Sequence, residues 1–255
     1  MQIDQRGQFG PSHDRVVAVV QARTGSTRLP GKVMLPLGGR PVLGWVIRAA
    51  QAAAGVDQVV VATSTAAGDD AVADLAEELG VAVVRGSEDD VLSRFVLAQE
   101  ATEADAVVRL TADCPLLDPA LIAQVVAAWR ADPTLGYVAT TLVRTLPRGL
   151  DVELVSSDAL HLADRHAERH HRVHVTSWLY TEPGRCRALG IVVAPDSHDL
   201  RVTVDTAVDV ELLTAVVAEL GDAPPTWSDL VALLRSRPDI AALNRDVRQK
   251  TLEEG

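Results

Sequence analysis

The chain has 255 residues, of which 47% are hydrophobic and 3% aromatic, so a core of aliphatic side chains is expected. Its formal net charge of −11 argues against binding to DNA or RNA, and its two cysteines exclude a disulfide scaffold. The N-terminus lacks an apolar signal region, and no apolar run approaches the length of a membrane span. These features predict a cytoplasmic protein that binds neither nucleic acid nor a membrane.

Strands and helices are predicted to alternate four times in the first half of the chain. Residues 1–14 are predicted to form a disordered lead, Val16–Val20 a strand buried on both faces, and Pro41 the start of a helix. The later elements are strands at 58–63, 81–84 and 106–110, and helices at about 69–79, 89–100 and 119–129. The short connections predict a parallel sheet with right-handed crossovers.

The regular alternation ends after Asp132. Short strands are predicted within 137–155, at 188–193 and at 200–204, and helices over 156–181 and 207–220. We interpret 133–200 as an elaboration of one domain that spans 15–236, because no low-complexity linker separates it. Residues 237–255 are predicted to form a peripheral charged tail. The predicted fold class is α/β, with a mostly parallel, Rossmann-like sheet covered by helices on both faces and a small mixed elaboration.

A cluster of phosphate-binding residue types follows the first predicted strand, where open α/β sheets bind their ligands. The segment 21–32 reads QARTGSTRLPGK, with three basic residues, two glycines and three hydroxyls. Glycines let backbone N–H groups approach a phosphate, and hydroxyls and cations donate to its oxygens. Its spacing fits neither a P-loop nor the G-x-G-x-x-G fingerprint, and a solvated basic loop is the alternative. The predicted nucleotide-binding residues of this loop are Gln21, Ala22, Arg23, Thr24, Gly25, Ser26, Arg28 and Lys32.

Seven sequence blocks occur in an order that resembles the cytidylyltransferase-like proteins. They include VVQARTGSTRLPGK, RGSEDDVLSRF (85–95), VVRLTADCPLLDP (107–119) and RVTVDTAVDVEL (201–212), and the resemblance covers roughly 16–220. It is closest to the spore-coat polysaccharide protein F type, which is related to the enzymes that make CMP-activated keto-sugar acids. The resemblance implies a GT-A-like fold and transfer of CMP from CTP to a small acceptor, with release of pyrophosphate. It also implies a homodimer built partly on 133–200.

Two aspartates at the ends of predicted strands are the expected metal ligands. Nucleotidyl transfer requires neutralisation of phosphate charge, and Mg²⁺ takes one or two carboxylates together with water and phosphate oxygens. Asp113 and Asp205 both match metal-holding aspartates of the family. The alternatives are a turn role for Asp113 and an N-cap role for Asp205. Arg23, Lys32 and Asp113 are the predicted catalytic residues, with the two cations holding the triphosphate and stabilising departing pyrophosphate.

Further contacts are expected at the ends of the other strands and in the elaboration. The additional nucleotide-binding candidates are Thr63, Ser64, Arg85, Asp90, Arg94 and Thr111. The acceptor-binding candidates are Arg148, Asp151, Glu153 and His174, and Asp151 and Glu153 are expected to face the same side of a strand.

Five of the seven histidines lie between 161 and 174. His166, His170 and His174 are predicted to share one helix face, which suggests zinc, but the metalloprotease pattern fails because Ala167 stands where it needs Glu. An exposed or dimer-interface face is the favoured interpretation for His161, His166 and His170.

The sequence is also compatible with two other functions. A GT-A glycosyltransferase would need a D-x-D-like motif, and the segment Thr111-Ala112-Asp113 has only one carboxylate. A nucleotide sensor without catalysis would need neither Asp113 nor Asp205. A Mg²⁺-dependent cytidylyltransferase is the favoured hypothesis, with the acceptor and the choice of base left open.

Overall fold

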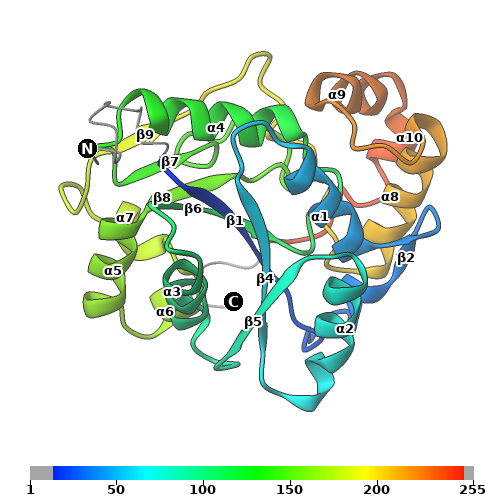
Figure 1. The fold of residues 1–255 in the computed structure, drawn as a ribbon. Coiled ribbons are helices and arrows are strands. Elements are labelled where there is room, and N and C mark those ends of the chain that lie inside the picture. Colours follow the sequence, from blue (N-terminus) through cyan, green and yellow to red (C-terminus); the bar gives the residue numbers. More distant parts are fainter. Residues whose placement is uncertain (1–13, 250–255) are drawn as a thin grey trace, which may run out of the picture.

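The computed structural model describes residues 14–249, which are built around a seven-stranded sheet in the order β5-β4-β1-β6-β8-β7-β9 (Figure 1). The predicted lead therefore lies outside the described residues except for Asp14. Four strands run parallel: β1 (Val16–Gln21), β4 (Gln58–Ser64), β5 (Ala82–Gly86) and β6 (Ala106–Thr111). These strands agree with the predicted ones within two residues.

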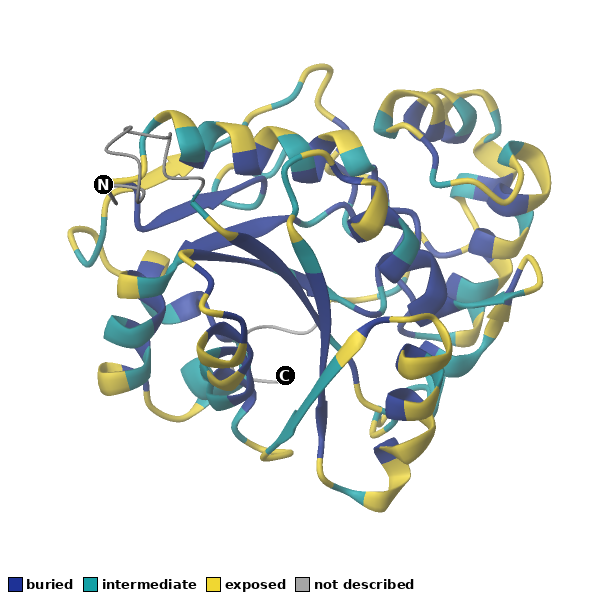
Figure 2. Ribbon diagram, in the orientation of Figure 1, coloured by how far each residue is buried: buried dark blue, intermediate teal, exposed yellow. Residues whose placement is uncertain are grey.

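The alternating side chains of β1 explain why helices cover both faces of the sheet. Val16, Ala18 and Val20 belong to one core cluster and Val17 and Val19 to the other. The first cluster is formed with helices α1, α2, α4, α8 and α9, and the second with α3, α5 and α7. Figure 2 shows the central strands buried between these layers. The predicted α/β class is confirmed.

The helices of the first half begin close to their predicted positions. Pro41 is the N-cap of the first helix, and Asp118 caps α4 by accepting a hydrogen bond from Ala120 N at 2.7 Å. The helices are α1 (Val42–Ala52), α2 (Asp70–Glu78), α3 (Val91–Thr102), α4 (Pro119–Ala131), α5 (Ser157–His166), α6 (His170–Val173), α7 (Ser177–Thr181), α8 (Ala207–Leu220), α9 (Trp227–Ser236) and α10 (Pro238–Ala241). Among residues 14–249, no helix is both long and apolar enough to span a membrane.

The other half of the sheet is mixed. β8 (Glu153–Ser156) runs antiparallel to both β6 and β7 (Tyr137–Ala139), and the edge strand β9 (Ala188–Gly190) runs parallel to β7. β9 ends earlier than the predicted 188–193, because the backbone N–H of Val193 donates to the Thr145 hydroxyl instead of to a neighbouring strand.

The strand predicted at 200–204 is wrong. This segment forms only an isolated bridge between Arg201 and Arg148, because its backbone bonds go to two separate segments. Val202 N donates to Arg148 O at 2.7 Å, whereas Val204 N donates to Asp113 O at 2.8 Å. Both valines are fully buried, which accounts for the strand-like apolar pattern.

The prediction that His166, His170 and His174 share the face of one helix is also wrong. α5 ends at His166, and Arg169 adopts a positive φ of 52° before α6 begins at His170. His166 stacks on Trp178 with ring centroids 5.6 Å apart, and His161 Nε2 lies 3.0 Å from Gln99 Oε1. The histidines therefore do not share one helix face.

Candidate active site

A cavity of about 1000 Å³ opens at the carboxyl ends of β1 and β6, the edge of the sheet where the sequence predicts the ligand. Its wall combines the loop after β1, the end of β6 with the turn after it, and parts of 141–153 and 203–205. The predicted site residues that line it are Gln21, Ala22, Arg23, Gly25, Ser26, Arg28, Lys32, Arg94, Thr111, Asp113, Arg148, Asp151, Glu153, His174 and Asp205.

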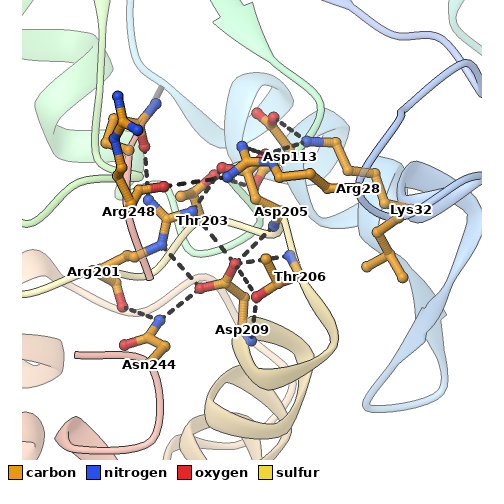
Figure 3. Close-up of polar contacts among 12 residues, drawn as sticks. Arg28, Lys32, Asp113, Arg201, Thr203, Asp205, Thr206, Asp209, Asn244 and Arg248 are labelled. Carbon is orange, nitrogen blue, oxygen red and sulfur yellow. Dashed lines mark hydrogen bonds and ion pairs between the residues drawn. The ribbon is translucent and has the colours of Figure 1, made fainter. Parts of the chain in front are cut away.

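Lys32 lies between the two predicted metal ligands. A left-handed Gly31, with φ 70°, turns the loop into a short 3-10 helix that begins at Lys32. Lys32 Nζ then donates to Asp113 Oδ2 at 2.6 Å and to Asp205 Oδ1 at 2.8 Å (Figure 3). Burial alone would lower the pKa of Lys32, but the charges of both carboxylates raise it above its ordinary value. The two carboxylates therefore favour the charged form of Lys32 at this point of the cavity.

Asp205 accepts from three cations. Its Oδ1 contacts Lys32 and lies 2.9 Å from Arg28 Nη2, while its Oδ2 lies 2.6 Å from Arg201 Nη2. Burial acts to raise the pKa of Asp205, but Lys32, Arg201 and Arg28 together lower it below the ordinary value. The N-cap alternative for Asp205 does not hold, because Thr206 caps α8 in a capping box with Asp209.

The backbone brings the two aspartates together. Asp113 O accepts hydrogen bonds from Val204 N at 2.8 Å and from the Thr203 hydroxyl at 3.0 Å. The turn after β6 is thereby tied to the residues just before Asp205. Carboxylate oxygens are ligands that hard divalent cations take, so Asp113 and Asp205 could hold such an ion. No group of three or more potential metal-binding side chains exists among the described residues, so a metal here would need phosphate or water ligands as well.

Arg94 is a buried guanidinium, and two of its nitrogens have no hydrogen-bond partner among the described residues. Its side chain comes from α3, lines the cavity and is 1% exposed. The atoms without a partner in this part of the chain are Nε and Nη1. Burial and the charge of Arg23 lower its pKa. Buried N–H groups without acceptors are costly, and an anionic ligand in the cavity would supply the missing acceptors.

Five of the predicted nucleotide-binding residues do not line the cavity. Thr24 donates through its backbone N–H and its hydroxyl to Asp69 Oδ1, at 2.7 and 2.8 Å. Ser64, at the end of β4, donates to the other oxygen of Asp69. Asp69 therefore fastens the predicted phosphate-binding loop to the neighbouring strand. The Thr63 side chain is fully buried without a hydrogen-bond partner among the described residues.

Arg85 and Asp90 also have structural partners. Arg85 donates to Ser64 O at 2.9 Å and to Asp70 Oδ1 at 2.7 Å. Asp90 caps α3 through Ser93 N at 3.0 Å and pairs with Arg172. These contacts position the loops around the cavity.

The acceptor candidates occupy the part of the cavity formed by the elaboration. Asp151 forms a two-pronged ion pair with Arg144, at 2.6 and 2.8 Å. Arg148 has no side-chain hydrogen bond or ion pair within 14–249, and burial together with the charge of Arg144 lowers its pKa. His174 lies at the end of α6 in the cavity wall.

Glu153 is engaged by other side chains. It is 5% exposed and accepts from Arg109, from the Tyr137 hydroxyl and from the Thr176 hydroxyl. Arg109 and Arg144 also line the cavity but were absent from the predicted residues. The sequence does contain an indication for Arg109, because a charged residue inside the buried strand at 106–110 needs a partner of opposite charge.

Replacing Arg109 by Met is expected to destabilise the protein by about 3 to 5 kcal/mol, because the Glu153 charge would remain buried without its cation. Urea unfolding followed by circular dichroism measures this loss. The double variant Arg109→Met/Glu153→Gln should lose less than the single variant, since no buried charge is left. Equal losses in both would contradict a cost arising from the charge.

Similar proteins identify the family. The model of the cytidylyltransferase family matches residues 17–231. The spore coat polysaccharide biosynthesis protein SpsF of Bacillus subtilis is 34% identical over 89% of this chain and 96% of its own length. A cytidylyltransferase structure from Leptospira borgpetersenii superposes with a TM-score of 0.86 at 28% identity, covering 93% of this chain and 99% of that one.

A structure of CMP:2-keto-3-deoxy-manno-octonic acid synthetase complexed with CTP shares the fold, with a TM-score of 0.61 at 22% identity, covering 80% of this chain and 99% of that one. The resemblance inferred from the seven blocks is thus confirmed by the family match. The chain belongs to the cytidylyltransferase family and is a nucleotidyltransferase.

Proposed function

We propose that this protein transfers CMP from CTP to a small anionic acceptor, with release of pyrophosphate, in a reaction that depends on Mg²⁺. The proposal rests above all on the convergence of Lys32, Asp113 and Asp205 beside the basic loop after β1. A triphosphate in that position needs cations and a divalent ion to neutralise its charge. The choice of CTP is supported by membership of the cytidylyltransferase family.

The proposed roles follow from the charges in the wall of the cavity. Arg23 and Lys32 bind the triphosphate and stabilise the charge that develops on the leaving pyrophosphate. Arg94 gains the acceptors that it lacks when the phosphates or the nucleotide base carbonyl reach it. Asp113 and Asp205 would hold Mg²⁺, which would supply charge neutralisation at the phosphates. An acceptor oxygen attacks the α-phosphorus, and the bond to the pyrophosphate oxygen breaks.

The acceptor is proposed to carry a carboxylate, phosphate or phosphonate group. Arg148 offers a guanidinium without a side-chain partner among the described residues, next to the Arg144–Asp151 pair. A guanidinium binds planar or tetrahedral oxyanions through two parallel hydrogen bonds. His174 remains an acceptor candidate in the same wall. A homodimer formed partly by 133–200 and a cytoplasmic location stay predictions.

A thermal-shift screen with the four NTPs and Mg²⁺ tests the nucleotide. CTP is expected to give the largest rise in Tm, because a ligand that binds only the folded state stabilises it by about 2.7 kcal/mol at a hundredfold excess over Kd. Pyrophosphate release is then measured with CTP and a panel of sugar acids, sugar phosphates and phosphonates. If no NTP releases pyrophosphate while a nucleotide sugar is cleaved, the glycosyltransferase hypothesis replaces this one.

A further inference from the structure

A continuous chain of hydrogen bonds connects the segment after α10 with the cavity (Figure 3). Asn244 Nδ2 donates to Asp209 Oδ1 at 2.7 Å, and Arg201 Nε donates to the same oxygen at 2.9 Å. Arg201 Nη2 then donates to Asp205 Oδ2 at 2.6 Å. Two side chains, those of Asp209 and Arg201, thus separate Asn244 from a carboxylate of the cavity.

Asp209 is the junction of this chain. It is 0% exposed, and its Oδ2 accepts from Asp205 N at 3.0 Å and from Thr206 N at 2.9 Å. The same carboxylate therefore fixes both the backbone of Asp205 and the guanidinium that holds the Asp205 side chain. Any rotation of the Asp209 carboxylate would change both contacts.

The segment 244–249 contacts the cations that flank Asp205. Arg248 O accepts from Arg28 Nη1 at 3.4 Å, and Gln249 Oε1 accepts from Arg201 Nη1 at 2.7 Å. Asn244 is 3% exposed and also donates to Arg201 O at 3.2 Å. An amide satisfies the buried Asp209 oxygen without adding a further charge to a cluster that already holds three cations and three carboxylates.

We propose that Asn244 is a positioning residue for Asp205. By fixing Asp209 it orients Arg201, and Arg201 directs the Asp205 carboxylate toward Lys32 and Asp113. Side chains that hydrogen-bond to metal ligands and orient them lower the metal affinity about 10- to 100-fold when they are removed. The inference rests on the proposed function in one respect, namely that Asp205 binds a divalent cation.

The test compares Asn244→Ala with the wild-type protein in a Mn²⁺ titration followed by electron paramagnetic resonance, with α,β-methylene CTP present and no acceptor. The Mn²⁺ dissociation constant is expected to rise about tenfold. In assays with an acceptor, kcat should fall while the KM for CTP stays near the wild-type value. A parallel change of both constants would point to a damaged nucleotide site.

Thr226→Ala is the matched control. Thr226 is the N-cap of α9, in the same C-terminal part of the fold, and its side chain accepts from Asp229 N at 3.1 Å. Both variants should lower Tm, but only Asn244→Ala should weaken Mn²⁺ binding. If Asn244→Ala does not fold, Asn244→Ser, which keeps a shorter donor, replaces it with the same expected direction.

A second measurement does not depend on metal. In metal-free protein, the Arg201 Nε–H is expected to give a slowly exchanging NMR signal, which Asn244→Ala should lose and Thr226→Ala should keep. If Asn244→Ala binds Mn²⁺ as tightly as the wild type, the positioning role is overturned and the proposed function stands. If the wild-type protein binds no Mn²⁺, the metal part of the proposed function is overturned, and the Arg201 signal alone decides whether Asn244 orients the guanidinium.

Discussion

Replacing Asp113 by Asn is expected to lower kcat/KM by at least about a thousandfold without unfolding the protein. An amide oxygen has the shape of the carboxylate but not its charge, so the divalent ion would lose one of its two anionic side chains and with it several kcal/mol of transition-state stabilisation. The Asp113 carbonyl that holds Thr203 and Val204 is unchanged by the substitution. Lys32 also keeps its contact with Asp205.

Pyrophosphate release measures the activity of Asp113→Asn, and a thermal melt checks its fold. Asp199→Asn is a suitable control, because Asp199 is exposed and forms a solvent-accessible ion pair with Arg235 outside the cavity. Such a pair contributes about 1 kcal/mol or less, so this variant should remain active. An Asp113→Asn variant with wild-type turnover would remove Asp113 from the metal site.

The parallel half of the fold could be predicted because its signals are local. The run Val16–Val20 has no polar interruption, which is typical of a strand buried on both faces, and capping residues mark the helices that follow. The rule that ligands bind at the carboxyl ends of strands then placed Lys32 and Asp113 on the same edge of the sheet. The structure joins them at 2.6 Å.

The remaining parts depend on contacts between distant segments. Val202 and Val204 are buried like strand residues, yet their backbone bonds go to different neighbours, and apolar periodicity cannot separate these cases. The phosphate-binding pattern of the loop predicts a nucleotide contact for Thr24, and the position of Ser64 at the end of a strand predicts a contact with the base or ribose. In the structure both hydroxyls bind the buried Asp69 instead.

Nothing in the sequence pattern indicates a role for Asn244. It lies in a polar segment that was predicted to be peripheral, and its partner Asp209 is 35 residues away in sequence. The burial of its amide follows from the packing of α10 against α8 and from its hydrogen bond to Asp209 in α8.

Replacing Arg94 by Met is expected to weaken CTP binding about 10- to 100-fold and, at the same time, to stabilise the protein without nucleotide. Hydrogen bonds to charged groups contribute about 1.5 to 3 kcal/mol, and the proposed bonds from this guanidinium to the nucleotide would be lost. Without nucleotide, however, Nε and Nη1 have no partner among the described residues, so an apolar side chain of similar length avoids the cost of a buried charge.

These opposite changes distinguish a binding role for Arg94 from a structural one. A gain of about 1 kcal/mol would raise Tm by roughly 2 to 4 °C in a chain of this size, while the further rise caused by CTP and Mg²⁺ should shrink. Arg48→Met is the control, since Arg48 donates to Asp222 O outside the cavity and its loss should leave the CTP-induced rise intact. If Arg94 has a structural role instead, Arg94→Met should lower Tm and leave the CTP-induced rise in Tm unchanged. The guanidinium would then form its hydrogen bonds within the protein and not with the nucleotide.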